Sequence, residues 1–212
     1  TGQKNGKTNG EVYKVKPGNS KYVDVNKDGV YNDADQGIIG CGQPTFNWGW
    51  NNTFNYKNFD FSFFVVGFHG FDIYNATHQM GYNLIKSQQM AGVTPMRELL
   101  NRWTPTNTNT DIPGFVKGGT ENKDFFSTRF VENGSFIKMK SITLGYTLPE
   151  ATCRSLGINN LRVYASVQNP FHITKYSGLD PEATMGSPLV QGVDWGAYPN
   201  SRNYLIGLNF SF

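Results

Sequence analysis

Segments of about ten residues in which apolar and polar side chains alternate are the most constraining feature of this sequence. Every second position of the last segment, residues 202–212, is apolar: Tyr204, Ile206, Leu208, Phe210 and Phe212. Most of the positions between them are small or polar. Because successive side chains of a β-strand point to opposite faces, this pattern predicts a strand with one apolar and one polar face.

The same alternation recurs in four further segments, at 46–56, 59–68, 136–148 and 161–170. We expect the five strands to pair as antiparallel neighbours in sequence order. One residue from each strand marks the expected apolar face: Trp48, Phe61, Leu144, Val163 and Leu208. If the sheet spans a membrane, these five side chains point to lipid.

Two features interrupt the alternation. The second half of 59–68 is apolar on both faces, which predicts a bulge or a contact with something inside the sheet. Lys138 and Lys140 stand where the apolar side of 136–148 would continue. Either the strand register shifts before Ser141, or these lysines lie beyond the apolar region.

The connections between the segments separate two all-β architectures. Short connections follow Tyr56 and Leu148, whereas long ones precede residue 46 and run through about 69–135 and 170–201. Outer-membrane barrels have short turns at one end and long extracellular loops at the other, which a soluble sandwich does not need. No apolar run is long enough for a membrane helix. The sequence therefore favours an antiparallel transmembrane β-barrel segment with long extracellular loops.

Composition argues against nucleic-acid binding and catalysis. The net charge is only +3 and forms no basic stripe. The three histidines are scattered, and no nucleophile–histidine–acid grouping or phosphate-binding loop is present. The acids Asp60, Asp72 and Glu132 have no spacing that pairs them for hydrolysis. We expect no catalytic residue and no enzyme.

The two cysteines, Cys41 and Cys153, are expected to remain unpaired. The predicted topology places Cys41 above the membrane and Cys153 in a periplasmic turn. A disulfide needs Cα atoms within about 7 Å, whereas the apolar band of a barrel is about 25 Å tall.

One segment has the spacing of a calcium-binding loop. The string DVNKDGVYNDAD, residues 24–35, supplies five candidate ligands: Asp24, Asn26, Asp28, the carbonyl of Val30, and Asp35. Calcium prefers hard oxygen ligands at these spacings, and Gly29 permits the sharp turn. The distal acid is Asp rather than the Glu of an EF-hand, so the loop resembles a dockerin-type loop. The alternative is an ion-free turn rich in Asp and Asn.

Long stretches resemble the C-terminal part of SusC/RagA-type TonB-dependent outer-membrane transporters. They are YVDVNKDGVYNDADQGIIG (22–40), NNTFNYKNFDFSFFVVGFHGFDIYN (51–75), ELLNRWTPTNTNTDIP (98–113), FVENGSFIKMKSITLGYTLP (130–149), NLRVYASVQNPFHITKYSGLDPE (160–182) and AYPNSRNYLIGLNFSF (197–212). The string QNPFHIT departs slightly from the usual Gln-Asn-Leu-Phe form.

This resemblance implies the last five strands of a roughly 22-stranded barrel around a plug. It also implies a SusD-like surface lipoprotein as partner, TonB-driven import of glycan or peptide oligomers, and an outer-membrane location. The plug and the TonB contact would lie in a preceding segment. We accordingly expect residues 1–45 to form an extracellular loop with the calcium motif, and residues 46–212 to form barrel strands and loops. The alternative function is a secreted, calcium-stabilised, carbohydrate-binding β-sandwich.

Overall fold

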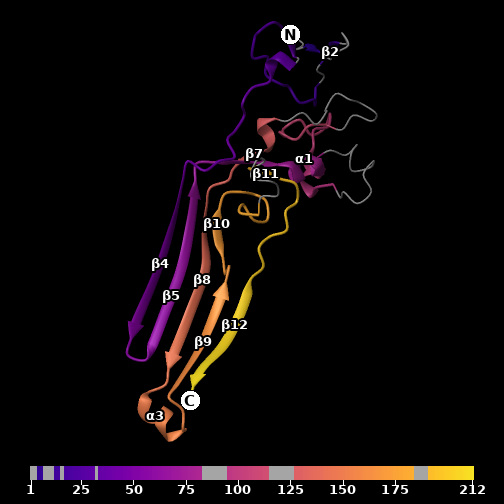
Figure 1. Cartoon of the computed structure of the whole chain (residues 1–212). Coiled ribbons are helices and arrows are strands. Elements are labelled where there is room, and N and C mark those ends of the chain that lie inside the picture. Colours follow the sequence, from indigo (N-terminus) through magenta and orange to yellow (C-terminus); the bar gives the residue numbers. More distant parts are fainter. Residues whose placement is uncertain are drawn as a thin grey trace. The chain divides into compact units, whose positions relative to one another are not determined.

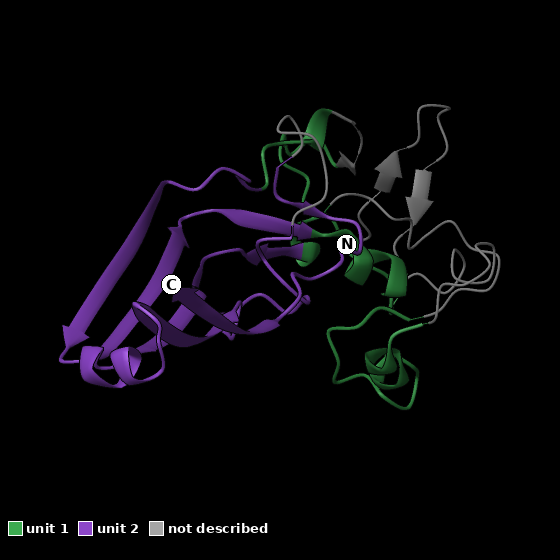
Figure 2. Ribbon diagram, turned by 60° about the horizontal axis from the view of Figure 1, so that its bottom comes forward, with its two compact units in different colours: residues 1–39, 75–130 green, residues 40–74, 131–212 purple. Residues whose placement is uncertain are grey.

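The computed structural model describes residues 4–6, 12–14, 17–31, 33–82, 95–114, 127–183 and 191–212. Two compact units divide the chain (Figure 2): residues 1–39 with 75–130, and residues 40–74 with 131–212. The boundaries of these compact units differ from the boundary at residue 45 that the sequence predicts. That boundary separates an extracellular loop from the barrel strands and loops, and it stays a prediction.

The second unit is built on one antiparallel sheet, called here the main sheet (Figure 1). Its five long strands, in sequence order, are β4 (Phe46–Tyr56), β5 (Phe59–His69), β8 (Phe136–Thr147), β9 (Asn160–Gln168) and β12 (Asn203–Ser211). Their order across the sheet is β12-β9-β8-β5-β4, so strands adjacent in sequence are also adjacent in space. The predicted five strands and their pairing are confirmed.

Tight geometry explains the short end of the sheet. Tyr56 pairs with Phe59, so Lys57 and Asn58 alone join β4 to β5, and Lys57 has a positive φ of 52°. At the same end, the helix α3 (Glu150–Ser155) joins β8 to β9 and buries Cys153. Cys41 and Cys153 are both free, and they flank opposite ends of the main sheet.

A bulge resolves the interrupted pattern around Lys138. Phe64 pairs with Ser141, but the next residue of β5, Val65, pairs with Met139, which leaves Lys140 as an extra residue. An extra residue reverses which face the following side chains occupy. Lys138, opposite Val66, therefore lies on the same face as Ser141, and the register shift is the correct alternative.

Short strands and loops cover part of the main sheet at its long-loop end. β10 (His172–Thr174) pairs with β8, and β6 (Asp72–Asn75), β7 (Val131–Asn133) and β11 (Val193–Asp194) form a three-stranded sheet. A small apolar core forms there from Val66, Phe71, Ile73, Phe136 and Tyr176, with Phe68 against it. The second, apolar half of β5 thus has the internal contact that its sequence predicts.

The described residues of the first unit form short elements. They are β1 (Lys4–Gly6), β2 (Val12–Lys14), β3 (Val30–Tyr31), η1 (Asp33–Asp35), α1 (Ala76–Tyr82), η2 (Arg97–Asn101) and η3 (Thr128–Phe130). Met96, Leu99, Leu100 and Trp103 have helical spacing, which predicts an α-helix over 95–105 that ends at Pro105. Only the 3-10 helix η2 forms there, with Leu99 buried and Leu100 exposed. Within the described parts of the chain, no helix has the length and apolar character needed to cross a membrane.

Candidate functional site

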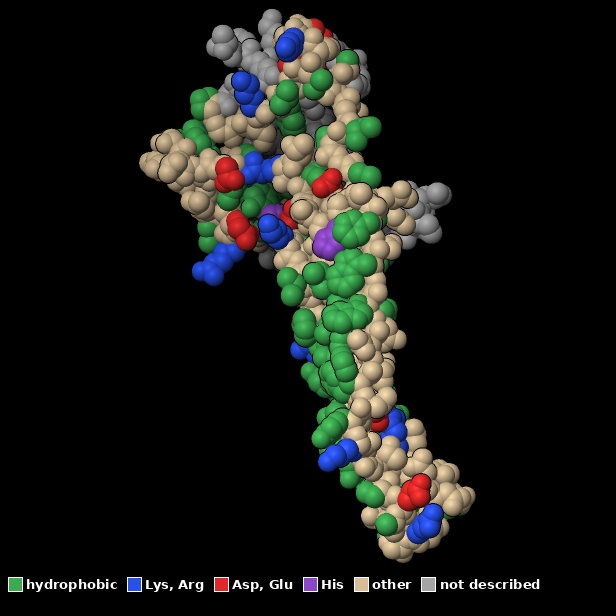
Figure 3. Space-filling view, turned by 90° about the vertical axis from the view of Figure 1, so that its left-hand side faces the viewer, with side chains coloured by type: hydrophobic (Ala, Val, Ile, Leu, Met, Phe, Trp, Pro, Cys, Tyr) green, Lys and Arg blue, Asp and Glu red, His purple; other side chains and the backbone are tan. Residues whose placement is uncertain are grey.

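One face of the main sheet is apolar across all five strands. The register aligns Phe54, Phe61, Leu144, Ala165 and Ile206 in one row, and this face is called the outer face. Phe54, Leu144 and Ile206 are 53%, 52% and 85% exposed, so no described part of the chain covers them. Figure 3 shows the apolar side chains as a band along the strands. Such a band needs an apolar surrounding, since soluble proteins rarely expose large contiguous apolar patches.

The residues expected to mark the apolar face do share it. Trp48 pairs with Gly67, and Phe61 is on the same face of β5; Val163 pairs with both Tyr146 and Leu208. Trp48 lies across Gly67, where a Cβ atom would collide with the indole ring. A β-sandwich would bury this face under a second sheet, and none covers it among the described residues.

Aromatic rings lie at both ends of the outer face, and further rings such as Trp50 and Phe63 lie between them. At the long-loop end, Phe46 stacks on His69 with ring centroids 5.0 Å apart. At the short end, Phe59 packs on Tyr146 at 4.7 Å. Aromatic girdles at both membrane interfaces are typical of transmembrane barrels.

The opposite face of the main sheet, called the inner face, is polar over its short-end half. Thr143 and Ser166 join their hydroxyls at 2.8 Å. Arg162 of β9 reaches across β8 to Asp60 of β5 through two hydrogen bonds, from Nε at 2.9 Å and from Nη2 at 2.6 Å. Gly145 lies between them, and any side chain there would collide with both. The sheet thus has the polar face that a water-filled lumen requires.

A charged cluster lies farther along the inner face. Nζ of Lys138 contacts Oδ2 of Asp180 at 2.8 Å and Oε2 of Glu182 at 2.7 Å, and Lys140 also pairs with Glu182. Asn200 donates to Asp180 from its backbone and its side chain, both at 3.2 Å. The Lys138 and Asp180 side chains are 2% and 3% exposed, so this pair is buried. A buried charge is tolerated only when it is paired and hydrogen-bonded, and Lys138 and Asp180 meet both conditions.

The two acids of the cluster are held in their ionised form. Burial alone would raise the pKa of Asp180, but hydrogen bonds from Lys138, Asn200 and Glu182 outweigh it and keep the pKa below its usual value. Burial likewise opposes ionisation of Glu182, and the hydrogen bonds from Lys138 and Lys140 lower its pKa overall. Asp180 and Glu182 are therefore both ionised at neutral pH.

The loop that contains Asp180 and Glu182 makes further hydrogen bonds. The hydroxyl of Tyr176 donates a hydrogen bond to Oδ2 of Asp194 at 2.6 Å. Burial is the main cause that raises the pKa of Tyr176, and the hydrogen bond to Asp194 is the second. Oδ1 of Asp194 accepts the backbone N–H groups of Gly196 and Ala197 at 2.8 and 3.0 Å. Ser177 donates to both carboxylate oxygens of Glu132.

The calcium-type loop lies in the first unit and is folded around its predicted ligands. Oδ2 of Asp24 accepts the N–H of Gly29 at 2.7 Å, and Oδ1 of Asn26 accepts the N–H of Asp28 at 2.9 Å. Oδ1 of the buried Asp35 accepts the N–H of Val25 at 2.9 Å, which draws the distal acid onto the loop start. Gly29 has a positive φ of 84°, as the motif predicted, and Val30 begins β3.

The fit of this loop to a cation rests on one atom. Oδ1 of Asp24 is buried and has no hydrogen-bond partner. Across the described segments, no group of three or more His, Cys, Asp and Glu side chains has the spacing of a metal site. The donor set of the loop, however, includes an amide and a carbonyl beside its carboxylates, and hard oxygen donors of this kind suit calcium.

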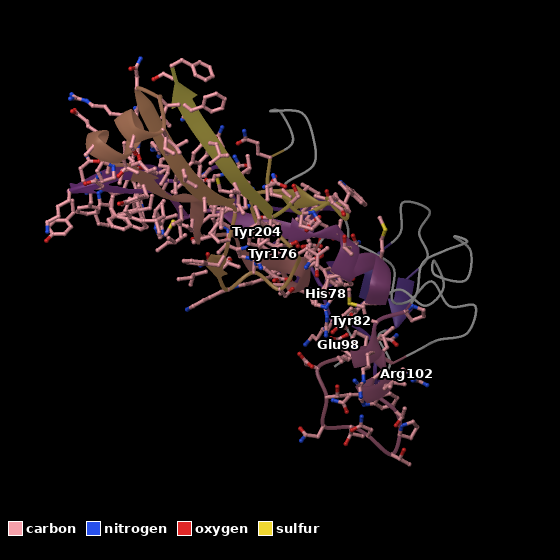
Figure 4. The ribbon with its side chains drawn as sticks, turned by 90° about the horizontal axis from the view of Figure 1, so that it is seen from below. His78, Tyr82, Glu98, Arg102, Tyr176 and Tyr204 are labelled. Atoms are coloured by element: carbon pink, nitrogen blue, oxygen red, sulfur yellow. The ribbon has the colours of Figure 1, made fainter. Side chains whose placement is uncertain are left out.

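Other residues of the first unit have packing roles. The ring of His78 meets Tyr82 edge-on at 4.6 Å and Phe130 at 6.4 Å, and Figure 4 shows His78 beside Tyr82. Trp103 fills the space over Gly18, whose carbonyl accepts the N–H of Gly114 at 2.7 Å. This contact fixes the chain just before the calcium-type loop.

Sequence reasoning missed both ion-pair systems on the inner face. Asp60 and Arg162 are 102 residues apart, and Lys138 and Asp180 are 42 apart. The available signal was a charged residue within three of the alternating strands, at Asp60, Lys138 and Arg162, since a charge inside a membrane-spanning segment marks the face turned from lipid.

Comparison with known proteins places the chain among outer-membrane receptors. No protein-family model matches it. "TonB-dependent receptor P3" of Formosa agariphila is 36% identical over 202 residues, which cover 92% of this chain and 19% of that protein. "TonB-dependent receptor SusC" of Bacteroides thetaiotaomicron is 32% identical over 199 residues, 93% of this chain and 18% of that protein. The chain thus spans about a fifth of the length of these relatives.

Solved structures agree with the sequence relatives. "Structure of the RagAB peptide transporter" matches with a TM-score of 0.65 and 28% identity over 77% of this chain and 17% of that chain. The RagAB peptide importer in the "closed-closed" state matches with a TM-score of 0.70 and 26% identity over 97% of this chain and 20% of that chain. These relatives are receptors and transporters rather than enzymes. The chain is therefore a segment of a SusC/RagA-type TonB-dependent outer-membrane receptor, with the fold of part of its transmembrane β-barrel.

Proposed function

We propose that this chain forms part of the barrel wall and the extracellular loops of a TonB-dependent importer. In this proposal the barrel takes up glycan or peptide oligomers with a SusD-like surface lipoprotein, and TonB acts through a segment outside this chain. The observation that carries the proposal is the two-faced main sheet, whose outer face is exposed and apolar at Phe54, Leu144 and Ile206.

The edges of the main sheet support a larger assembly. Among the described strands, β4 and β12 each have one neighbour in this sheet, so the other edge of each strand offers backbone groups to a further strand. In a bilayer every unsatisfied N–H or C=O group costs several kcal/mol, so open edges do not persist there. Strands from the rest of the barrel would satisfy both edges.

Affinity isolation from native outer membranes tests the assembly. A tag in the long-loop region should recover the remaining barrel and plug segments and a SusD-like lipoprotein, and the complex should need detergent. Recovery of this chain as a detergent-free, soluble monomer would refute the proposal.

Uptake assays test the substrate class. Cells that carry the receptor should accumulate a labelled glycan or peptide oligomer, and they should lose this uptake when TonB is removed. The RagAB relative is named a peptide transporter, so peptide mixtures belong in the panel beside oligosaccharides. Uptake that is independent of TonB would exclude this mechanism.

We propose, separately, that residues 24–35 bind a structural calcium ion. The ligands would be Asp24, Asn26, Asp28, the Val30 carbonyl and Asp35. A buried Asp24 oxygen without a partner supports this assignment, since a cation would satisfy it. Calcium would fix an extracellular loop rather than act in transport chemistry.

Proteolysis tests the calcium proposal. Calcium should protect residues 20–40 of the full receptor from cleavage, and Asp24→Ala should abolish this protection while the barrel stays folded. Lys27→Ala is the matched control, because Lys27 lies in the same loop but supplies no proposed ligand. Equal cleavage with calcium, magnesium and chelator would show that the loop is only a turn.

A further inference from the structure

The loop after β10 lies on the inner face of the main sheet. Its described parts, residues 176–183 and 191–200, are called here the ledge. Lys138 belongs to the inner face because the bulge at Lys140 places it opposite Val66. Lys138 is paired with two acids, Asp180 and Glu182, and both acids belong to the ledge. The ledge is therefore attached to the face that would line the lumen.

Several attachments hold the ledge in place. The ring of Tyr176 is part of the apolar core with Val66 and Phe136, while its hydroxyl donates to Asp194. Ser177 is held by Glu132, next to β8. Asn200, at the far end of the ledge, returns to Asp180 and Glu182. The two ends of the ledge thus meet at the same charged cluster.

These contacts oppose opening of the ledge. Lifting it would break the short contacts of Lys138 with both acids in a buried site. It would also expose Tyr176 and the core beneath it. A mobile lid is expected to have few buried contacts, whereas the ledge has an apolar core and a buried ion pair.

We propose that the ledge is a fixed part of the barrel wall, which narrows the long-loop mouth of the lumen and stays attached to β8 while substrate passes. This inference rests on the proposed transport function. It assigns Lys138 and Lys140 as anchoring residues and separates the ledge from any loop that opens for the substrate.

Hydrogen exchange in the purified full receptor tests the attachment. Lys138→Met should speed amide exchange in residues 176–183 and 191–200 by at least about tenfold, as expected when a buried charge loses its partner. The double variant Lys138→Met with Asp180→Asn should recover part of the protection. Arg154→Met is the control, because Arg154 pairs with Glu150 at an 81% exposed site and should leave exchange unchanged. Unchanged exchange in Lys138→Met would overturn the proposal.

If Lys138→Met fails to assemble, Tyr176→Phe provides a second measurement. It keeps the ring and removes only the bond to Asp194, so it should raise exchange around Asp194 with the barrel intact. No change there would also count against an anchored ledge.

Cross-linking tests whether the ledge stays fixed during transport. The variants Ser177→Cys and Glu132→Cys, combined in a Cys41→Ser background because Cys41 is exposed, can be joined by a reducible bismaleimide. Uptake should be unchanged by the cross-link. Uptake that stops on cross-linking and returns on reduction would overturn a fixed ledge. The uncross-linked receptor reports the proposed transport function separately, and exchange rates report the ledge whether or not any substrate is imported.

Discussion

Replacing Leu144 with arginine is expected to prevent stable assembly of the receptor in the outer membrane. Leu144 is 52% exposed on the outer face, in register with Phe61 and Ala165. An arginine on the lipid face of a barrel costs roughly 2–4 kcal/mol at the middle of the bilayer and less near its surfaces. A loss at the upper end of that range is a large fraction of the about 5–15 kcal/mol by which folded proteins are stable. The folded fraction on heat-modifiability gels should fall sharply.

Thr143→Arg is the matched control for this change. Thr143 is the adjacent residue of β8 but lies on the inner face, where it meets Ser166. The same side chain would enter a polar lumen, so the folded fraction should fall much less. Equal losses in the two variants would contradict the assignment of the outer face to lipid.

Replacing Phe136 with alanine is expected to destabilise the long-loop end of the barrel by about 3–5 kcal/mol, the usual cost of emptying a buried phenylalanine site. Phe136 is 4% exposed, and its ring lies 5.1 Å from Phe68 and 6.3 Å from Phe71. The resulting cavity would remove support from Tyr176 as well. Extracellular protease should then cut residues 171–197 in intact cells, at a rate far above that of the unchanged receptor.

Phe54→Ala separates this cavity effect from the simple loss of a ring. Phe54 is an aromatic residue of the same sheet, but it is 53% exposed on the outer face. Lipid can fill the space that it leaves, so the cost should be well below that of Phe136→Ala. A similar protease sensitivity in both variants would argue against a buried core on the inner face.

The sequence alone predicted the main sheet because each strand has its own alternating pattern. The apolar residues of 202–212 and 136–148 identify a face without any information from a partner strand. Short connections after Tyr56 and Leu148 then order the strands as sequential neighbours. The spacing of Asp24, Asn26, Asp28 and Asp35 likewise needs no tertiary contact to be recognised.

The helix expected at 95–105 shows where local pattern fails. The apolar residues with helical spacing are Met96, Leu99, Leu100 and Trp103. Leu99 is buried, however, whereas Leu100 is exposed. Trp103 instead packs over Gly18, and its N–H donates to the carbonyl of Ile112. Contacts made by a distant segment outweighed the intrinsic preference of a short helix, which has little stability of its own.

Only the tertiary structure decided which face Lys138 occupies. Local alternation assigns it to the side of Leu144, but the extra residue Lys140 reverses that assignment. A bulge depends on how β8 pairs with β5, and in the bulged register Lys138 and Lys140 pair with Asp180 and Glu182 of a distant loop. The sequence by itself therefore determined the strands and their two faces, since alternation is a local property. The position of the ledge, the apolar core beneath it and the buried Lys138–Asp180 pair depend on long-range contacts, which no local sequence pattern encodes.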